Sequence, residues 1–400
     1  MSTPNTTDQY SRFMVDLFDE RKIQGIPTAF QSLFGTSGAS KTVFQPDSET
    51  VEIDILRANG QRLAATVNRG QSSSAVSDGK NTTDQVYSNQ TRKWPLIEEE
   101  SNINSKQLLS RLAGENPYSG RNQVDRNRSL AMDLHNDQVR KSVRTMEFLA
   151  AQSILTGTQP AIIGTSNTDL IYDFHRNSTH NVTPTYAWNN ASATISNDLD
   201  DACELIESDS YMTPNFCAIG DDAMAALIRD DEIEAIADNR RYELIQISTK
   251  NPVPPEYEKF VTAGWIPRGM LKTIRGRNLW LFNNNQRYTS AAGVSTRFLP
   301  SDKAIILDIN ARFDRYFGPR DAFALTNDER SWMNEMFGFN MSAAPMPQNV
   351  SEKGIIDPSM FFFDAYRGTG RKTVTLRSQV APIYPTTQTD AIVVLSGLTE

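Results

Sequence analysis

The chain has 400 residues, enough to bury a sizeable core and to form two or three domains. Its net charge of −8 argues against a dedicated nucleic-acid binder, which needs clustered Lys and Arg to neutralise phosphates. Cys203 and Cys217 are the only cysteines, too few for a disulfide framework and wrongly spaced for zinc. With neither a membrane-spanning apolar run nor a signal-peptide pattern, we expect a protein made in a cytoplasm.

The first predicted element is a short helix over residues 10–18. Its apolar residues recur at helical spacing and form one face. This face carries Tyr10, Phe13, Met14, Leu17 and Phe18. Residues 26–34 follow and are expected to be extended and partly apolar.

A hairpin is expected next. Residues 50–57 alternate acidic side chains with Val51, Ile53 and Ile55, which predicts a strand with one buried face. Residues 58–60 are expected to turn the chain into a return strand over 61–69. The polar stretch 70–90 is long for a loop, and such loops are usually functional or disordered. An extended pattern resumes over residues 91–100.

The most regular predicted element is a helix over residues 125–157, about 45 Å long at 1.5 Å per residue. Charged residues occupy one face, with Asp137 and Lys141 in the favourable i,i+4 order. Gly157 suits a left-handed helix cap. The opposite, apolar stripe is predicted to be core and includes Val139, Val143, Met146, Ala150 and Ile154.

A mixed α/β region follows. Two helices are predicted over 196–208 and 221–238, with Asp221 or Asp222 placed to cap the second. Buried strands are predicted over 215–220, 279–284 and 304–309. The final section, 355–400, is punctuated by prolines and rich in strand patterns, and we expect a hairpin turn at 368–373.

A nucleotide-binding loop is the first chemical alternative, because residues 35–42 nearly match G-x-x-x-x-G-K-[ST]. Ser40 replaces the second glycine, and the β-branched pattern after Thr42 predicts a strand where a phosphate loop needs a helix. Asp308 follows a buried strand, as a magnesium-holding aspartate would, but without such a loop it only ends that strand. We therefore favour a surface turn over an NTPase site.

No other motif indicates catalysis. His175 and His180, with Asp173 nearby, form a weak metal-ligand pattern. We favour the interpretation that they are surface histidines without a metal-binding role. His135 lies inside the long helix and is interpreted as a packing residue. The sequence has no G-x-S-x-G motif, and three histidines leave little room for a Ser or Cys triad. We therefore expect no enzyme activity, no cofactor and no metal site.

Six groups of sequence stretches follow one another in a distinctive order along nearly the whole chain. They are IPTAFQSLFG and SKTVFQPDSETVEID, RLAATVNRG, VRTMEFLAAQSILTG (143–157), DLIYDFHRNSTHNVTPTYAW, FLPSDKAIILDINARFDRYFGP, and DPSMFFF with SQVAPIYPTTQTDAIVVLSG. In this order they resemble the phage lambda-type (E-type) major capsid protein family. The last stretch departs from the family, because Gln379 and Val380 precede Ala381-Pro382 where family members often show Ser-Ala-Pro.

This resemblance implies an α+β, Hong Kong 97-like major capsid protein fold. Its expected parts are an N-terminal arm (1–45), an extended loop (46–100), a peripheral domain (101–195) with a spine helix at about 125–157, an axial α/β domain (196–350), and a β-rich segment (351–400) that returns to these domains. It also implies hexamers and pentamers of an icosahedral shell around double-stranded DNA, with scaffolding, portal and decoration proteins as partners. The protein would be assembled in the host cytoplasm and end in the virion.

Residues of the arm and loop are candidates for contacts between subunits, because a long polar tip cannot bury itself in one subunit. In some relatives a lysine crosslinks to an asparagine of a neighbour, but lambda-type shells more typically rely on decoration proteins. Lys93 lies near the loop. An encapsulin-like compartment and a tail-tube protein remain alternatives. The candidate contact residues are Tyr10, Phe13, Met14, Leu17, Phe18, Val51, Ile53, Ile55, Arg69, Val76, Lys80, Val86 and Tyr87.

Overall fold

A computed structural model describes most of the chain. None of the helices among the described residues is long and apolar enough to cross a membrane. The described residues are 26, 28–35, 40–44, 50–59, 85–104, 123–160, 171–230, 233, 253–290, 293–318, 361–367 and 373–399. The predicted helix over 10–18 and the candidate return strand over 61–69 therefore lie outside the described residues.

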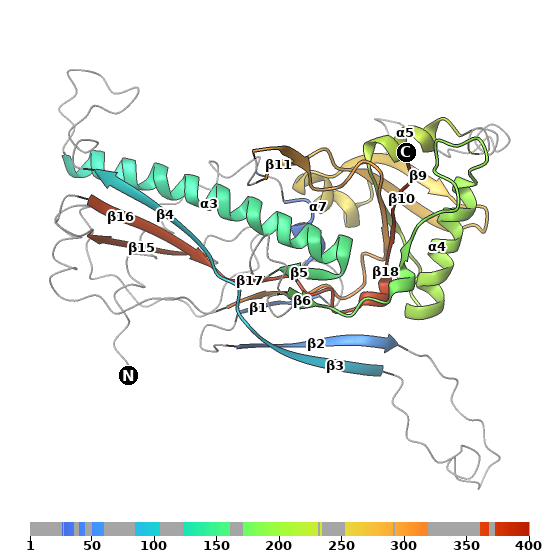
Figure 1. The fold of residues 1–400 in the computed structure, drawn as a ribbon, viewed down its shortest axis with the longest axis horizontal. Coiled ribbons are helices and arrows are strands. Elements are labelled where there is room, and N and C mark those ends of the chain that lie inside the picture. The colour runs from blue at the N-terminus through green and yellow to red at the C-terminus, as the bar shows by residue number, and fades with distance from the viewer. Residues whose placement is uncertain are drawn as a thin grey trace, which may run out of the picture.

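Helix α3 (Gln123–Thr156) has 34 residues and dominates one half of the molecule (Figure 1). It begins two residues before the predicted start, and Gly157 follows its last residue with a φ of 72°, as expected for a left-handed cap. The predicted apolar stripe is buried, with no member more than 1% exposed: Val139, Val143, Met146, Ala150 and Ile154.

A three-stranded antiparallel sheet lies along α3 (Figure 1), in the order β15 (Phe362–Arg367), β16 (Thr373–Val380) and β4 (Ile97–Asn104). The antiparallel pairing of β15 with β16 confirms that the chain reverses between residues 367 and 373. The side chains of two polar residues of α3 contact this sheet. Gln138 donates to the carbonyl of Leu376 at 2.9 Å, and the His135 ring packs edge-on against Phe363.

A six-stranded mixed sheet forms the other half (Figure 1), in the order β7-β18-β13-β8-β10-β9. Its central strands alternate side chains between two cores. One core, with Cys217 and Ile306, packs against helices α4 (Ile195–Ser210) and α5 (Asp221–Ile228). The other core, which includes Phe216, is continuous with that of α3. The strands are β7 (Asn181–Val182), β18 (Ile392–Leu395), β13 (Ala304–Leu307), β8 (Phe216–Ile219), β10 (Asn278–Asn283) and β9 (Ile266–Lys272).

A two-stranded antiparallel ribbon, β2 (Thr50–Asn59) with β3 (Gln85–Lys93), extends along one side of the molecule (Figure 1). The predicted strand at 50–57 is confirmed, but two details of the prediction are wrong. Ala58 and Asn59 belong to the strand instead of a turn, and the partner of β2 lies at 85–93, inside and beyond the stretch that was expected to be loop. Ribbon pairing continues as far as Asn59 opposite Gln85.

Short elements complete the described fold. Strand β1 (Thr42–Phe44) pairs in parallel with β14 (Arg315–Phe317), which also pairs with β17 (Pro382–Ile383). The remaining helix is α7 (Pro255–Ala263). The remaining strand pairs and 3₁₀ turns are β5 (Thr158–Pro160) with β6 (Ile171–Asp173), β11 (Arg287–Thr289) with β12 (Ser295–Arg297), and η2 (Gln31–Leu33), η5 (Ser178–His180) and η7 (Thr389–Ala391).

Two further expectations are wrong. Residues 31–33 form the turn η2 instead of an extended segment. Neither Asp221 nor Asp222 caps α5, whose N-cap is Gly220 without a side-chain bond. Asp221 instead accepts from the Asn283 amide at 2.8 Å and pairs with Arg297 at 2.6 Å, so its carboxylate serves tertiary contacts.

Candidate interaction surfaces

The turn η2 docks the segment 28–35 onto α3 and α7. Phe30 and Phe34 are fully buried, and the Phe30 ring lies 5.1 Å from that of Trp265. The Trp265 indole donates to the Ala29 carbonyl at 2.8 Å. Apolar burial and this hydrogen bond together fix the place where the N-terminal part of the chain meets the body of the molecule.

A buried carboxylate completes this docking. Glu147 of α3 is 0% exposed, and its two carboxylate oxygens accept from the backbone amides of Phe30 at 2.7 Å and Gln31 at 3.1 Å. Burial raises the pKa of Glu147 to about 7, although these amide donors act in the opposite direction. The carboxylate satisfies amide groups at the start of η2 that would otherwise lack acceptors.

The C-terminal end of α3 is held by an arginine from the following segment. Arg176 donates to the carbonyls of Ile154 at 2.5 Å and Leu155 at 2.7 Å, and to the side chain of Asn181 at 2.8 Å. These are carbonyls of the last helical turn, which have no partner within the helix. A cation at this end is also favoured by the helix dipole.

Arg176→Met is therefore expected to lower the free energy of unfolding by about 2 kcal/mol, because it removes charged hydrogen bonds from a partly buried helix end. Arg176→Lys keeps the charge but loses the forked donor geometry, so its loss should be about half as large. Urea denaturation followed by circular dichroism measures both values. A methionine variant as stable as the lysine variant would contradict the capping role.

The base of the β2–β3 ribbon is packed against the chain's own core. Val51, Ile53 and Ile55 are 0%, 1% and 0% exposed. They form a cluster with Tyr172, Phe174, Tyr316 and Ile383. This corrects the expectation that these three side chains contact a neighbouring subunit, because they have no exposed surface to offer. They anchor the ribbon instead.

The face of β2 opposite these anchoring residues is acidic. The acidic side chains of Glu52 and Asp54 point outward from β2 and are exposed. Among the described strands, β3 pairs only with β2, so its nine-residue outer edge is not covered by another described strand. An open edge of this length is a template for pairing with another chain.

Other predicted contact residues are only partly described. Val86 and Tyr87 lie on β3, opposite Ala58 and Leu56, while Lys93 ends the strand and is exposed. The remaining candidates fall outside the residues that the structure describes: Tyr10, Phe13, Met14, Leu17, Phe18, Arg69, Val76 and Lys80.

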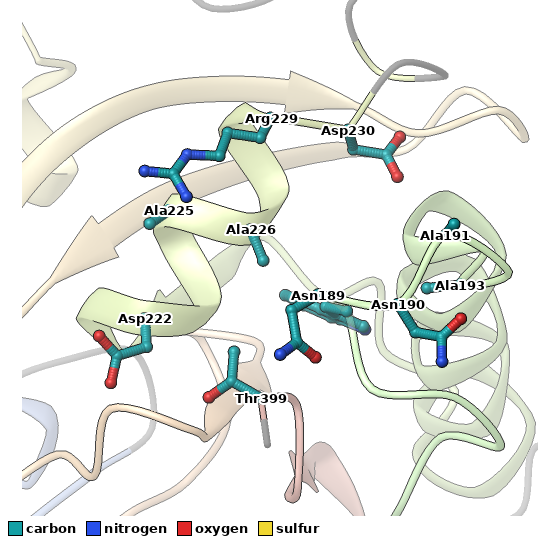
Figure 2. A pocket seen from close by; sticks show the side chains of 11 residues that line it. Asn189, Asn190, Ala191, Ala193, Asp222, Ala225, Ala226, Arg229, Asp230 and Thr399 are labelled. Atoms are coloured by element: carbon teal, nitrogen blue, oxygen red, sulfur yellow. The ribbon is translucent and has the colours of Figure 1, made fainter.

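An open pocket of about 780 Å³ lies beside α5 (Figure 2). Alanines 225 and 226 of the helix form one wall, and Asn189 and Asn190 face them across the opening. Charges sit around it at Asp222, Arg229 and Asp230. Its lining residues include Thr399 and these carboxylates, and no histidine, cysteine or serine.

The segment 40–44 leads into a β-strand and does not form a phosphate-binding loop. Thr42 begins strand β1, while a phosphate loop would open a helix here. The Ser40 hydroxyl accepts from the Phe313 amide at 2.9 Å, and the Lys41 amide donates to Asp314 at 2.7 Å. These contacts tie the segment to the approach of β14. The predicted strand after the turn is thus confirmed. Residues 36–39 of the predicted turn lie outside the described residues.

The histidines serve packing and structural hydrogen bonds. His180 is fully buried, with its ring nitrogens 2.8 Å from the Ile392 carbonyl and 2.9 Å from the Asp209 carboxylate. His175 lies 3.7 Å from Asp173 in an exposed pair. Burial lowers the pKa of His135 to about 4, consistent with a packing residue. The part of the chain that the structure describes brings together no cluster of three metal-ligating side chains.

The chain is similar to a known protein family and to solved structures. A family model described as phage major capsid protein E matches residues 22–350. A solved structure described as a prophage capsid protein of E. coli CFT073 is 15% identical, covers 99% of each chain and gives a TM-score of 0.61. A phage-related protein from Bordetella bronchiseptica RB50 is 10% identical over 99% of each chain, with a TM-score of 0.47. No curated protein matches the chain.

Proposed function

The chain belongs to the phage major capsid protein E family, and from this premise we propose that it is the main head subunit of a tailed bacteriophage. It has the Hong Kong 97-like capsid fold, a mixed α+β architecture, as the resemblance of its sequence to this family implies. In the proposed head, copies of the chain form hexamers and pentamers that close into an icosahedral shell around double-stranded DNA.

The observation that carries this proposal beyond the family is the β2–β3 ribbon. Its base is anchored by fully buried apolar residues, while nine residues of β3 keep an open outer edge among the described strands. A rigidly anchored projection with an open edge suits contact with an adjacent copy. Repetition of modest contacts over a closed shell then sums to a stable assembly.

The proposed domains are those that the family resemblance implies. Residues 1–45 form the arm, 46–100 the extended loop, 101–195 the peripheral domain, and 196–350 the axial domain. The last segment, 351–400, returns to both halves, which is supported by the pairing of β16 with β4 and of β18 with β13. The axial domain is proposed to meet its copies around the local symmetry axes.

The proposed partners other than the chain itself are scaffolding, portal and decoration proteins. The packaged DNA is proposed to lie inside without sequence-specific contacts, in keeping with the net charge of −8. Assembly would take place in the host cytoplasm before the shell becomes part of the virion. We propose no enzymatic step for this subunit.

Electron microscopy of the overexpressed chain, alone and with the products of neighbouring genes, tests the proposal. We expect closed icosahedral shells or isolated hexamers and pentamers. Stacked rings would indicate a tail tube, and shells loaded with an enzyme encoded beside the gene would indicate an encapsulin-like compartment. A chain that remains monomeric with all neighbouring gene products would contradict the proposal.

A further inference from the structure

Glu147 is the one glutamate of α3, and its carboxylate lies in the core between this helix and the turn η2. Its hydrogen bonds run to the backbone amides of Phe30 and Gln31, which belong to a segment more than a hundred positions away in the chain. No arginine, lysine or histidine side chain pairs with it among the described residues. Besides these backbone amides, the side-chain amide of Gln31 also lowers the pKa of Glu147, while burial raises it by more.

The surroundings of this carboxylate contain few other groups that could change charge. Gln31 joins the network by donating from its side chain to the Val143 carbonyl at 3.2 Å. The Tyr384 hydroxyl donates to the Gln31 side chain at 3.3 Å, and burial raises the pKa of Tyr384. Arg315 of β14 interacts with Tyr384 and keeps its charge at ordinary pH. Only Glu147 is therefore expected to titrate near neutrality.

From this geometry we propose that Glu147 is a proton-dependent latch, which holds the segment 28–35 on the long helix firmly when neutral and weakly when ionised. Opening of η2 lets water reach the carboxylate, and an ionised carboxylate gains far more from water than a neutral carboxyl does. The latch controls how firmly the segment 28–35 is docked on α3. The inference stands on these contacts and does not depend on the shell proposed above.

The direction of the pH effect follows from proton linkage. The pKa of Glu147 is about 7 in the closed state and 4.5 for a hydrated glutamate, so the closed state binds the proton more tightly. Its contribution to closing is complete below pH 4.5 and is lost as the pH rises through 7. Between pH 5.5 and 8.5, two pKa values of 4.5 and 7 predict a roughly thirtyfold fall in the closing equilibrium constant.

Hydrogen–deuterium exchange of the full-length chain tests the latch. Protection factors, corrected for intrinsic exchange, are measured by mass spectrometry for peptides covering 28–34 across pH 5.5–8.5. We expect the protection of 28–34 in the wild-type protein to fall by at least about tenfold over this range. Protection that stays constant over this range would overturn the proposal.

Three variants sharpen the test. Glu147→Gln and Glu147→Met remove the titrating group, and in each variant the protection of 28–34 should no longer show the wild-type fall with pH. Asp137→Asn removes an exposed carboxyl from the same helix and should keep the wild-type pH profile. If either neutral variant folds and retains the wild-type profile, another group controls the segment and the latch is disproved.

Discussion

Met146→Asp should destabilise the subunit by about 3–5 kcal/mol, because it places an unpaired charge in the core. Met146 is 1% exposed and lies on the stripe by which α3 packs against the rest of the molecule. Burial of an ionised carboxylate without a partner costs several kcal/mol, and the lost apolar contacts add to this cost. Val143→Asp, at a position with 0% exposure, should have a similar effect.

Thermal and urea unfolding, followed by circular dichroism, measure this loss. Arg144→Asp is a matched control, since Arg144 is an exposed neighbour on the same helix and the change also introduces an aspartate. The control should change stability by no more than about 0.5 kcal/mol. Equal stability of the Met146 variant and the control would show that this face of α3 is not core.

Closure of the ribbon with a short turn should strongly reduce shell formation and leave the subunit folded. Asn59 pairs with Gln85, so replacement of residues 60–84 by Asn-Gly would join β2 to β3 through a two-residue hairpin. The anchoring residues Val51, Ile53 and Ile55 are untouched, so stability should fall little. We expect at least a tenfold smaller yield of shells, because the proposed contacts with neighbours are lost. Sedimentation and electron microscopy measure the yield.

A length-matched variant provides the control for this deletion. Replacement of residues 60–84 by 25 residues of Gly and Ser keeps the chain length and removes only the sequence. Loss of shells in both variants would show that specific side chains of residues 60–84 make the contacts. Loss of shells in the deletion variant alone would show that the length of this segment is what matters. Normal shells from the deletion variant would contradict the bridging role of the ribbon.

Regular local patterns made much of the fold predictable. Residues 125–157 carry an uninterrupted apolar stripe and a terminal Gly157, so the helix was placed to within two residues at its start. The strands β2, β8, β10 and β13 were also recognisable, because buried strands are short apolar or alternating runs. In each case the signal lies within a few adjacent residues.

Features that depend on distant partners were not predictable from such patterns. The partner of β2 is separated from it by residues 60–84, and the nearer residues 61–69 were predicted to pair with it. η2 forms where apolar side chains meet α7 and where Glu147 can accept from its amides, although its local sequence favours an extended chain. Asp221 had the right position for a helix cap, but it binds Asn283 and Arg297 instead.

The contacts that hold the proposed arm and the long helix were missed for the same reason. Glu147 stands in a helical apolar pattern as an ordinary polar residue, and nothing nearby in sequence shows that it meets Phe30. Arg176 follows the helix by twenty residues, with no local sign that it returns to the Ile154 carbonyl. A buried charge within a core stripe is the signal that could have drawn attention to Glu147.

The covalent path from the ribbon to the sheet along the long helix is short. Strand β3 ends at Lys93 and β4 begins at Ile97, and the Trp94 ring between them packs so closely on Gly318 that a side chain there would collide with it. Trp94 therefore holds the end of the ribbon against the end of β14, and a displacement of the ribbon would be passed on to the sheet along α3.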